Sequence, residues 1–473
     1  MKYIFFTYDL ISASIAHKLM NEGRTVVVAQ VHDVKDLGND DKPEDAESKK
    51  SRLSNYNGIF EKYDAKKVLK KMKNIKNKDE WFVFVDFNNL WRFSELVLKM
   101  GFTKGFFPTR QDFELEKDRA KAKELVEENY PDLSLVQTYE FQKIQEAIDF
   151  LDEQEETCFV LKGNSDLAKT HVPSSTNSFL ANSELIDVMT EFQKDYEKDG
   201  FILEERIQDP MELTPEVIFW NGEPIAYSVD IETKPIGSGN IGDQTGCASC
   251  LVLRTEPEDK INQVAFPQFV MDFAKNRKGM FVWDASCLYR DGIAYFGEFC
   301  SCRVGWDSIF NEIMMAGSAS QFFERIASGK NPFVYRYGAS VRGFSLPEKD
   351  KGESFKVCES SMRWMECVDK NIFPYEMKKD GENVTNLGSS TDLVVFAAAS
   401  DDKHDAIEEV YDAIENFAFD DLYYKPRFDF CSFEYPSSIM NRYEYGLMDG
   451  LYSCESEGEI QEVETAESMQ ELQ

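Results

Sequence analysis

Residues Lys234 to Gly246 read KPIGSGNIGDQTG, and this glycine-rich loop is the stretch that decides the fold. An apolar run, Ile225 to Asp230, comes just before it, and two more follow at Met280 to Asp284 and Ile293 to Phe299. An Asn-Gly pair separates the first of these runs from Val217 to Trp220, which is the strongest short signal for a β-hairpin. The loop is therefore expected to connect elements of a sheet, and by itself it predicts only a long turn.

Three further features stand in a fixed order around this loop. Lys162 ends the strand Cys158 to Leu161, where an ammonium group can reach phosphates as a point charge. Residues Leu203 to Ile207 form a strand edge that can pair with adenine, and Glu212 can accept both ribose hydroxyls. Glu298 follows a glycine turn and can hold magnesium against phosphates. Together with the loop, these features have the order and spacing of an ATP-binding cleft between two sheets.

Each feature also has a simpler interpretation. Lys162 alone is typical of a solvated strand end, Glu212 of a surface residue, and Glu298 of a salt-bridge partner. Their joint order, and not any single one of them, favours a nucleotide site.

The same segments resemble the phosphoribosylamine–glycine ligases of the ATP-grasp superfamily. The loop and its continuation to Ser249 are similar to the family pattern H-K-R-x-G-D-G-D-x-G-P-N-T-G-G-M-G. Glu114 to Lys123 resembles E-L-E-x-S-K-x-x-A-K, with Arg119 in place of the ATP-contacting Lys. Val160 to Ser165 is similar to V-V-K-A-D-G, and Glu298 to Gly305 to E-F-N-A-R-F-G. With matches near 380–386 and 419–424, the resemblance covers about residues 1–427.

The resemblance implies an α/β and α+β multidomain fold. Its parts are an N-terminal parallel-sheet pre-ATP-grasp domain (1–110) and a two-part ATP-grasp core (111–330) with a small lid subdomain at about 135–205. A small C-terminal α/β domain (331–430) and an acidic tail (431–473) complete the chain. Repeated β-α-β patterns in the first third independently indicate a parallel sheet.

The resemblance also implies a reaction and its residues. ATP, with Mg²⁺ or Mn²⁺, phosphorylates a glycine-like carboxylate, and an amine then displaces phosphate to give an amide. The nucleotide is assigned to Arg119, Lys162, Glu204, Glu205, Ile207 and Glu212, and the metal to Glu298. The catalytic residues are Lys234 and Arg303, and the substrate loop supplies Gly237, Gly239, Asn240, Thr245 and Gly246.

The sequence departs from the family where the amine is received. The family's G-x-G-G-R-E-H loop is replaced by Thr7 to Ala13, where Asp9 puts a negative charge near a helix N-terminus that favours anions. Its G-P-E-x-P-L loop is replaced by Asp86 to Asn89, and its second metal ligand, an Asn, by Cys300. A neutral thiol is a poor magnesium ligand. Two hypotheses follow: an active ligase with the family's or an altered amine, or a degenerate ATP-grasp protein with a nucleotide-binding or structural role.

Composition narrows the choice of partners. The formal net charge of −33 over 473 residues disfavours nucleic acid and anionic membranes, since both require clustered Lys and Arg. We expect small-molecule substrates, a monomer or homodimer, and a cytoplasmic location without a signal peptide. The ten cysteines indicate reduced thiols, although Cys247 and Cys250 with Cys300 and Cys302 make a weak zinc alternative.

The patterns also predict individual elements. Residues 32–58 are expected to form an exposed loop, Ala65 to Met72 a Lys-rich amphipathic helix, and residues 114–128 and 261–277 one helix each. From Ser453 onward the acids stand without Lys or Arg, which is typical of a solvated, disordered tail.

Overall fold

The computed structural model describes most of the chain. The described residues are 1–33, 46–154, 156–164, 170–208, 210–238, 244–290, 293–300, 308–345, 361–362, 370–381, 383–388, 390–417 and 422–427. Arg303, Cys302, Gly239, Asn240 and the acidic tail therefore lie outside them.

The first part of the chain forms a parallel sheet in the strand order β3-β2-β1-β4-β5. The strands are β1 (Lys2–Thr7), β2 (Thr25–Gln30), β3 (Lys62–Asp64), β4 (Trp81–Val85) and β5 (Gly105–Phe106). The helices of this part are α1 (Ala13–Asn21), α2 (Ala46–Ser54), α3 (Ala65–Met72) and α4 (Trp91–Lys99). The parallel sheet and the helix over 65–72 are as expected, but the loop expected over 32–58 is wrong in part, because α2 occupies 46–54.

A larger antiparallel sheet continues from the parallel one. It contains β9 (Met211–Trp220), β10 (Glu223–Pro235), β11 (Gln244–Thr255), β12 (Met280–Arg290) and β13 (Ile293–Phe299). Beyond β11 come β14 (Tyr337–Ser345), β19 (Asp392–Ser400), β16 (Ile372–Pro374) and β20 (Leu422–Tyr424). The hairpin between β9 and β10 turns at Asn221 and Gly222, whose φ angles of 52° and 89° are those of the expected turn.

The two sheets meet where β12 begins beside β5, with Met280 opposite Phe106. A Cβ on Gly279 would lie 2.3 Å from the carbonyl oxygen of Gly105, and the φ of Gly279 is +74°. Only glycine suits this close approach at a positive φ. One continuous hydrophobic core therefore extends from Tyr3 and Phe84 to Val341 and Phe396.

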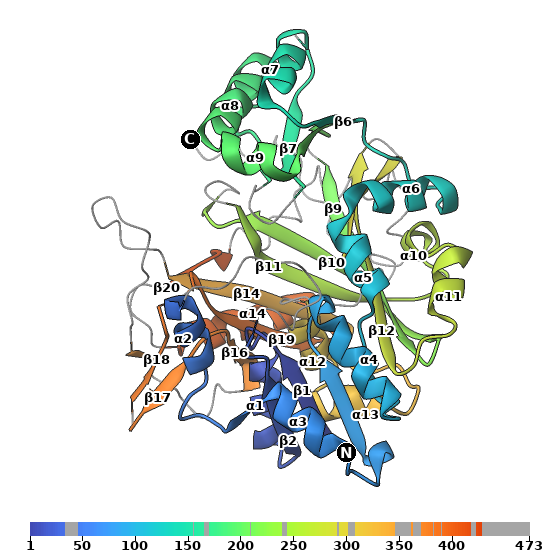
Figure 1. Ribbon diagram of the computed structural model, residues 1–473, viewed down its shortest axis with the longest axis vertical. Coiled ribbons are helices and arrows are strands. Elements are labelled where there is room, and N and C mark those ends of the chain that lie inside the picture. The colour runs from blue at the N-terminus through green and yellow to red at the C-terminus, as the bar shows by residue number, and fades with distance from the viewer. Residues whose placement is uncertain are drawn as a thin grey trace, which may run out of the picture.

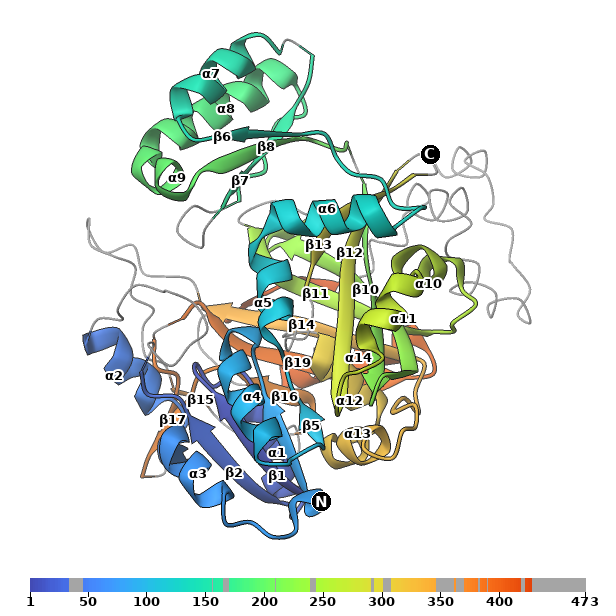
Figure 2. The same cartoon turned by 45° about the vertical axis from the view of Figure 1, so that its right-hand side comes forward.

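A separate three-stranded unit lies at the top of Figure 1 and is set apart from both sheets in Figure 2. Its strands are β6 (Thr138–Phe141), β8 (Phe201–Glu205) and β7 (Phe159–Gly163), in that order. Its helices are α7 (Ile144–Asp152), α8 (Ser178–Glu191) and α9 (Gln193–Asp199). The unit has its own core, which includes Phe159, Leu185 and Phe201. It can thus pack independently of the large sheet.

Further helices cover the large sheets. They are α5 (Arg110–Lys117), α6 (Arg119–Asn129), α10 (Lys260–Ala265), α11 (Gln268–Ala274), α12 (Ser308–Met315), α13 (Ala319–Ile326) and α14 (Lys403–Glu415). A small sheet has the order β15 (Ser361–Met362), β18 (Asn383–Thr385), β17 (Lys378–Asp380).

Two of the helices expected as single elements are divided. Residues 114–128 break at Asp118, whose side chain accepts a hydrogen bond from the Lys121 amide and caps α6. Residues 261–277 break at Phe266-Pro267, because proline lacks an N–H and disfavours helix at the residue before it. The mixed α/β architecture of several units is confirmed.

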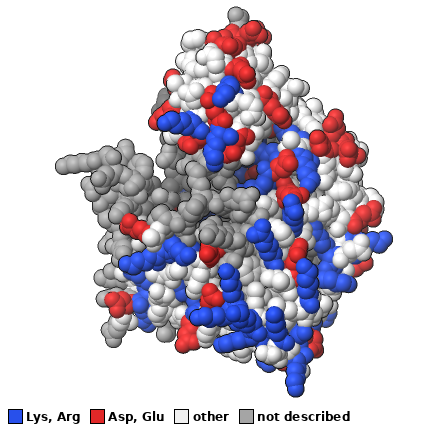
Figure 3. Space-filling view, in the orientation of Figure 1, with Lys and Arg blue, Asp and Glu red and all other residues white. Residues whose placement is uncertain are grey.

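The negative net charge is unevenly distributed over the surface. Figure 3 shows Lys and Arg gathered over the lower part of the molecule, where α3 and α4 lie. The exposed lysines there include Lys66, Lys67, Lys70, Lys71 and Lys73. Within the described residues, no helix combines the length and apolarity needed to cross a bilayer.

Candidate functional site

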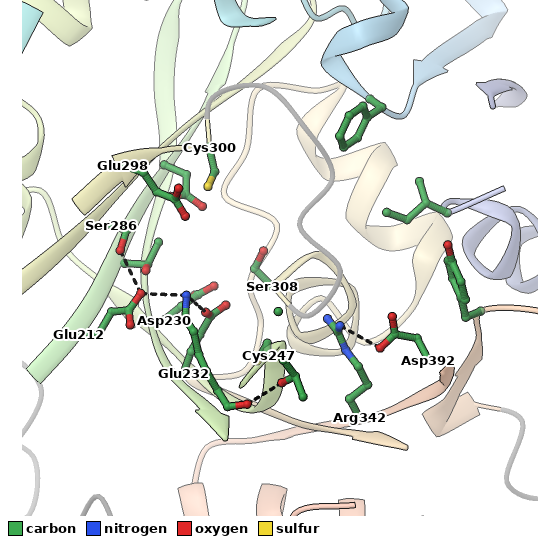
Figure 4. Close-up of a pocket in the computed structure, with 18 residues that line it drawn as sticks. Glu212, Asp230, Glu232, Cys247, Ser286, Glu298, Cys300, Ser308, Arg342 and Asp392 are labelled. Atoms are coloured by element: carbon green, nitrogen blue, oxygen red, sulfur yellow. Dashed lines mark hydrogen bonds and ion pairs between the residues drawn. The ribbon is translucent and has the colours of Figure 1, made fainter. Parts of the chain in front are cut away.

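A polar cavity of about 410 Å³ lies over the antiparallel sheet. Its charged lining residues come from six strands: Glu212, Asp230, Glu232, Lys234, Asp284, Glu298, Arg342 and Asp392. In Figure 4, Glu212, Asp230 and Glu232 lie on one side of the cavity, and Arg342 with Asp392 lies on the opposite side. Six carboxylates thus face two basic side chains.

Lys234 is the basic group of the first side. Its Nζ lies 3.0 Å from Glu212 Oε1 and 3.6 Å from Glu232 Oε2. Burial by itself lowers the pKa of an ammonium group, but Glu212, Glu232 and Glu298 together raise the pKa of Lys234 above its usual range. Lys234 therefore stays charged, and it is already surrounded by acids.

Arg342 is the basic group of the second side. Its Nη1 lies 3.3 Å from Asp392 Oδ1, and the guanidinium is almost completely buried. Tyr375 lines the cavity nearby, and burial, followed by the charges of Asp9 and Asp392, raises the pKa of its hydroxyl. This hydroxyl is consequently neutral and can donate a hydrogen bond.

A second, much smaller space lies between α6, the three-stranded unit and β13. Glu204 on β8 is buried and forms ion pairs with Lys162 on β7 and with Lys123 on α6, the latter at 2.5 Å. Burial favours the neutral acid, but the two ammonium groups outweigh it and lower the pKa of Glu204 below its usual value. The sequence-predicted Arg119, Lys162, Glu204 and Glu298 all line this space. With Lys123, the structure brings three cations together from segments far apart in the chain.

Glu298 belongs to both spaces. It lines the small space and the large cavity, its Oε2 lies 4.0 Å from Arg119 Nη2, and half of its side chain is exposed. Cys300 follows it at the edge of the large cavity. A divalent cation fits this carboxylate by donor chemistry, since oxygen ligands suit Mg²⁺, and three nearby cations suit polyphosphate oxygens. Arg119, Lys123 and Lys162 are the side chains that would hold such a ligand.

The glycine-rich loop is anchored at its start. Thr245 Oγ1 donates to the carbonyl of Lys234 at 2.7 Å, and Gly246 lines the large cavity. Lys425, completely buried beyond β20, donates to the carbonyls of Pro235 and Gly237 at 3.0 and 2.8 Å. The C-terminal part of the chain therefore fixes where the loop begins. Gly239, Asn240 and Arg303 lie outside the described residues.

Glu205 and Ile207 are not brought to either space. Glu205 ends β8 opposite Phe159, its amide donates to the carbonyl of Gln137, and Ile207 is half-buried just after that strand. Both lie at the strand edge expected to face adenine, but neither is among the residues that line the two described spaces.

The amides of the loop after β1 donate to one acid of that loop, Asp9, and to Asp86, which follows β4. The amides of Ile11 and Ser12 donate to Asp9 Oδ1 and Asp86 Oδ2, at 3.4 and 3.3 Å, and the Ser12 hydroxyl donates to the same Asp86 oxygen at 2.7 Å. Leu10 holds the turn with a φ of 69°, a conformation that glycine adopts more readily. Burial raises the pKa of Asp9, and burial together with the charge of Asp9 raises the pKa of Asp86 to about 8. The two carboxyls thus titrate as a pair.

Other buried acids lie close to the cavity floor. Glu312 on α12 is hydrogen-bonded to Glu216 on β9, and burial raises the pKa of both carboxyl groups. Possible metal ligands from Asp230, Glu232 and Cys250 lie within 4.8 Å of one another. Burial raises the pKa of the Cys250 thiol strongly, which makes it a poor ligand. The zinc alternative involves Cys302, which lies outside the described residues; Cys250 is a reduced cysteine, as expected.

Sequence reasoning missed seven charged residues of the site: Lys123, Asp230, Glu232, Asp284, Arg342, Asp392 and Lys425. Asp230 had a readable signal, because it alternates with Glu232 and Lys234 along one face of β10. Arg342, Asp392 and Lys425 had none, since only the tertiary fold brings their strands beside the loop.

Comparison with solved structures identifies the architecture. The chain aligns with phosphoribosylamine–glycine ligase from Thermotoga maritima at a TM-score of 0.60 and 13% identity, over 90% of this chain and 99% of that one. It has the ATP-grasp fold. The expected fold is therefore confirmed across nearly the whole chain.

Other ATP-grasp structures align comparably. A biotin carboxylase from Campylobacter jejuni, in complex with an ATP analogue, gives a TM-score of 0.57 at 13% identity over 95% of this chain and 98% of that one. The biotin carboxylase domain of a Hydrogenobacter thermophilus 2-oxoglutarate carboxylase, complexed with MgADP and bicarbonate, gives 0.54 at 13% identity over 89% and 91%. No protein-family model and no curated protein matches the sequence. At these identities the likeness shows the fold alone.

Proposed function

We propose that the protein is an ATP-dependent carboxylate–amine ligase of the carbon–nitrogen class. A carboxylate takes the γ-phosphoryl group of ATP to become an acyl phosphate, and an amine displaces phosphate, giving an amide, ADP and phosphate. The observation that carries the proposal is the small space that Arg119, Lys123 and Lys162 line together with the carboxylates of Glu204 and Glu298. Several cations clustered beside a carboxylate can bind a polyphosphate and its metal ion. A purely structural role would not need so many charged groups in one place.

The proposed roles of Arg119, Lys123, Lys162, Glu204 and Glu298 follow from their positions, and those of the other residues follow from the resemblance in sequence. Arg119, Lys123 and Lys162 bind phosphates, Glu204 orients the two lysines, and Glu298 holds Mg²⁺ or Mn²⁺. By the resemblance, the nucleotide site also includes Glu205 and Ile207, which line neither described space, and Glu212, which lines the large cavity. Lys234 and Arg303 neutralise developing charge on the carboxylate, and the loop of Gly237, Gly239, Asn240, Thr245 and Gly246 positions it. Positioning and charge neutralisation are the main contributions that such a reaction needs from a protein.

The proposal includes the organisation of the chain. Residues 1–110 form the pre-ATP-grasp domain, 111–330 the core with a lid at about 135–205, and 331–430 the C-terminal domain. The lid is the three-stranded unit, and its Glu204 must exchange its lysine partners in part when a nucleotide enters.

A second candidate is a protein that has the ATP-grasp fold but no ligase activity. The observations that favour it are Cys300 beside Glu298 and the small volume, about 10 Å³, of the space between the phosphate-binding side chains. In this alternative the ion pairs of Glu204 are permanent and only stabilise the lid.

Two measurements separate the candidates. Calorimetric titration with ATP, with and without magnesium, tests the nucleotide site. Hydroxylamine then tests carboxylate activation, since this small neutral nucleophile converts any acyl phosphate to a hydroxamate whatever the natural amine is. Magnesium-dependent binding, followed by ADP and hydroxamate formation with glycine or a related carboxylate, supports the ligase. Absence of both binding and hydroxamate leaves the second candidate.

A further inference from the structure

The large cavity extends from the antiparallel sheet to the end of the parallel one. Ile11, after β1, and Phe87, after β4, both line it. β1 and β4 are neighbours in the parallel sheet. The strand that follows β1, β2, lies on one side of this pair, and the strand that follows β4, β5, lies on the other. The carboxyl ends of strands at such a switch point are the usual ligand position in α/β sheets.

Four backbone amides at the start of α1 and in the turn before it already donate to groups of the protein. The free amides at the N-terminus of a helix normally attract phosphate or carboxylate. Ahead of α1, however, the amide of Leu10 donates to Thr7 Oγ1 at 2.9 Å, and those of Ile11 and Ser12 donate to Asp9 and Asp86. The amide of Ala13 is bound to the Leu10 carbonyl. An incoming phosphate would therefore meet two carboxyl groups where it needs donors.

The rest of the cavity is also lined mainly by negatively charged side chains. Asp230 and Glu232 face it from β10, and Asp392 faces it from β19. Its two basic groups are engaged, Lys234 by Glu212 and Glu232, and Arg342 by Asp392. Carboxylates that line a closed space repel an anion and attract an ammonium ion, and the low dielectric of the interior strengthens both effects.

We propose that the amine accepted by this site is a cation without a phosphate group, of the class of alkyl amines, diamines and amino alcohols. The inference rests on the proposed ligase function, because it names the acceptor of that reaction. The ammonium ion binds among the carboxylates and gives one proton to one of them. The neutral nitrogen then attacks the acyl carbon, phosphate leaves with the electron pair of the broken C–O bond, and the second proton that the nitrogen loses as the amide forms goes to the departing phosphate. Over a full cycle the carboxylate passes its proton to solvent.

Ethanolamine and O-phosphoethanolamine make a matched test, since they differ only in the phosphate. The rate of ADP release is measured with each amine, and with putrescine, using the carboxylate that gives hydroxamate. We expect kcat/KM for ethanolamine or putrescine to exceed that for phosphoethanolamine at least about tenfold. Equal or better use of phosphoethanolamine overturns the inference, as does failure of every amine to replace hydroxylamine.

Single-residue variants test which carboxylates discriminate between the two amines. Asp9→Asn and Glu232→Gln each remove one carboxylate from the acceptor end. Each should raise KM for ethanolamine and lower the ratio of its kcat/KM to that of phosphoethanolamine. Asp272→Asn, the same change at an exposed position on α11, should alter neither value. Unchanged selectivity in both acceptor-end variants contradicts the inference, and Asp9→Asn still tests it if Glu232→Gln fails to fold.

The two proposals fail in different ways. Hydroxamate formation with selectivity for phosphoethanolamine overturns the acceptor class and leaves the ligase standing. Absence of hydroxamate with every carboxylate overturns the ligase, and the acceptor with it.

Discussion

The two ends of the cleft differ in the charge that they offer to a ligand. At the end beside the three-stranded unit, Arg119, Lys123 and Lys162 balance the carboxylates around them. In the large cavity as a whole, which extends to β1 and β4, six carboxylates face two basic groups, and Asp9 lies just beyond it. The first end suits an anion that arrives with a metal ion, and the second suits a cation.

This difference shows that the parts of one fold can change independently. The two lysines proposed to bind phosphate come from β7 and α6, whereas the proposed acceptor end is formed by loops of the parallel sheet and by strands of the antiparallel one. The charge of those loops can change sign without moving the residues proposed to bind the nucleotide. Likeness in fold alone therefore supports an inference about the ligand of the nucleotide end better than one about the ligand of the acceptor end.

The largest effect is expected from removing a phosphate-binding cation. Lys162→Ala should lower ATP-dependent turnover by about 100-fold or more, since charge stabilisation of a transferring phosphoryl group is lost. The measurement is ADP release in the hydroxylamine assay. Lys198→Ala, an exposed lysine of the same unit, is the control and should keep full activity. Equal activity in the two variants would mean that the nucleotide end does not work as described.

Lys425→Met tests the loop that both ends share. Methionine has a similar length but cannot donate to the carbonyls of Pro235 and Gly237, so both are left without this partner. We expect a loss of about 1–3 kcal/mol in the free energy of unfolding, with reduced turnover. Denaturant unfolding measures it, with exposed Lys330→Met as the control. A loss no larger than that of the control would show that Lys425 does not anchor the loop.

The acid pair at the acceptor end predicts a pH dependence of stability. Asp86 has a pKa of about 8 in the folded protein and one near 4 when unfolded, so between these values the folded state binds more protons. The stability that this proton contributes is full below about pH 4 and is lost as the pH rises through 8. The slope is at most about 1.4 kcal/mol per pH unit.

Asp86→Asn should flatten this slope. Melting temperatures between pH 5 and pH 8.5 measure it in the variant and in the unmodified protein. An identical fall in both would place the titrating group elsewhere.

The smallest effect is expected where charge is kept. Arg119→Lys introduces the residue that the similar ligase motif has at this position, and its ammonium group can still reach the small space. Turnover should stay within about threefold of the original, whereas Arg119→Ala should lose more, because it removes the charge. A larger loss in Arg119→Lys would show that the planar guanidinium beside Glu298 is itself required.

Much of the fold was readable from local patterns. The Asn221-Gly222 hairpin, the amphipathic helix α3 and the β-α-β repeats follow from spacing and turn chemistry, which depend on neighbouring residues only. The breaks at Asp118 and Pro267 were missed because a continuous helical pattern outweighed a cap and a proline. The helix over 46–54 was missed because its sequence is almost entirely polar.

The sequence by itself determined the order of Lys162, Glu204, Lys234 and Glu298, and with it the resemblance that predicted the fold. It also showed that Asp9 stands where an anion is expected. Only the tertiary structure decided which charges meet: that Lys123 and Lys162 share Glu204, that Arg342 pairs with Asp392, and that Lys425 fixes the loop. The physical reason is that ion pairs form between side chains on strands distant in the chain, whereas sequence patterns report only neighbours.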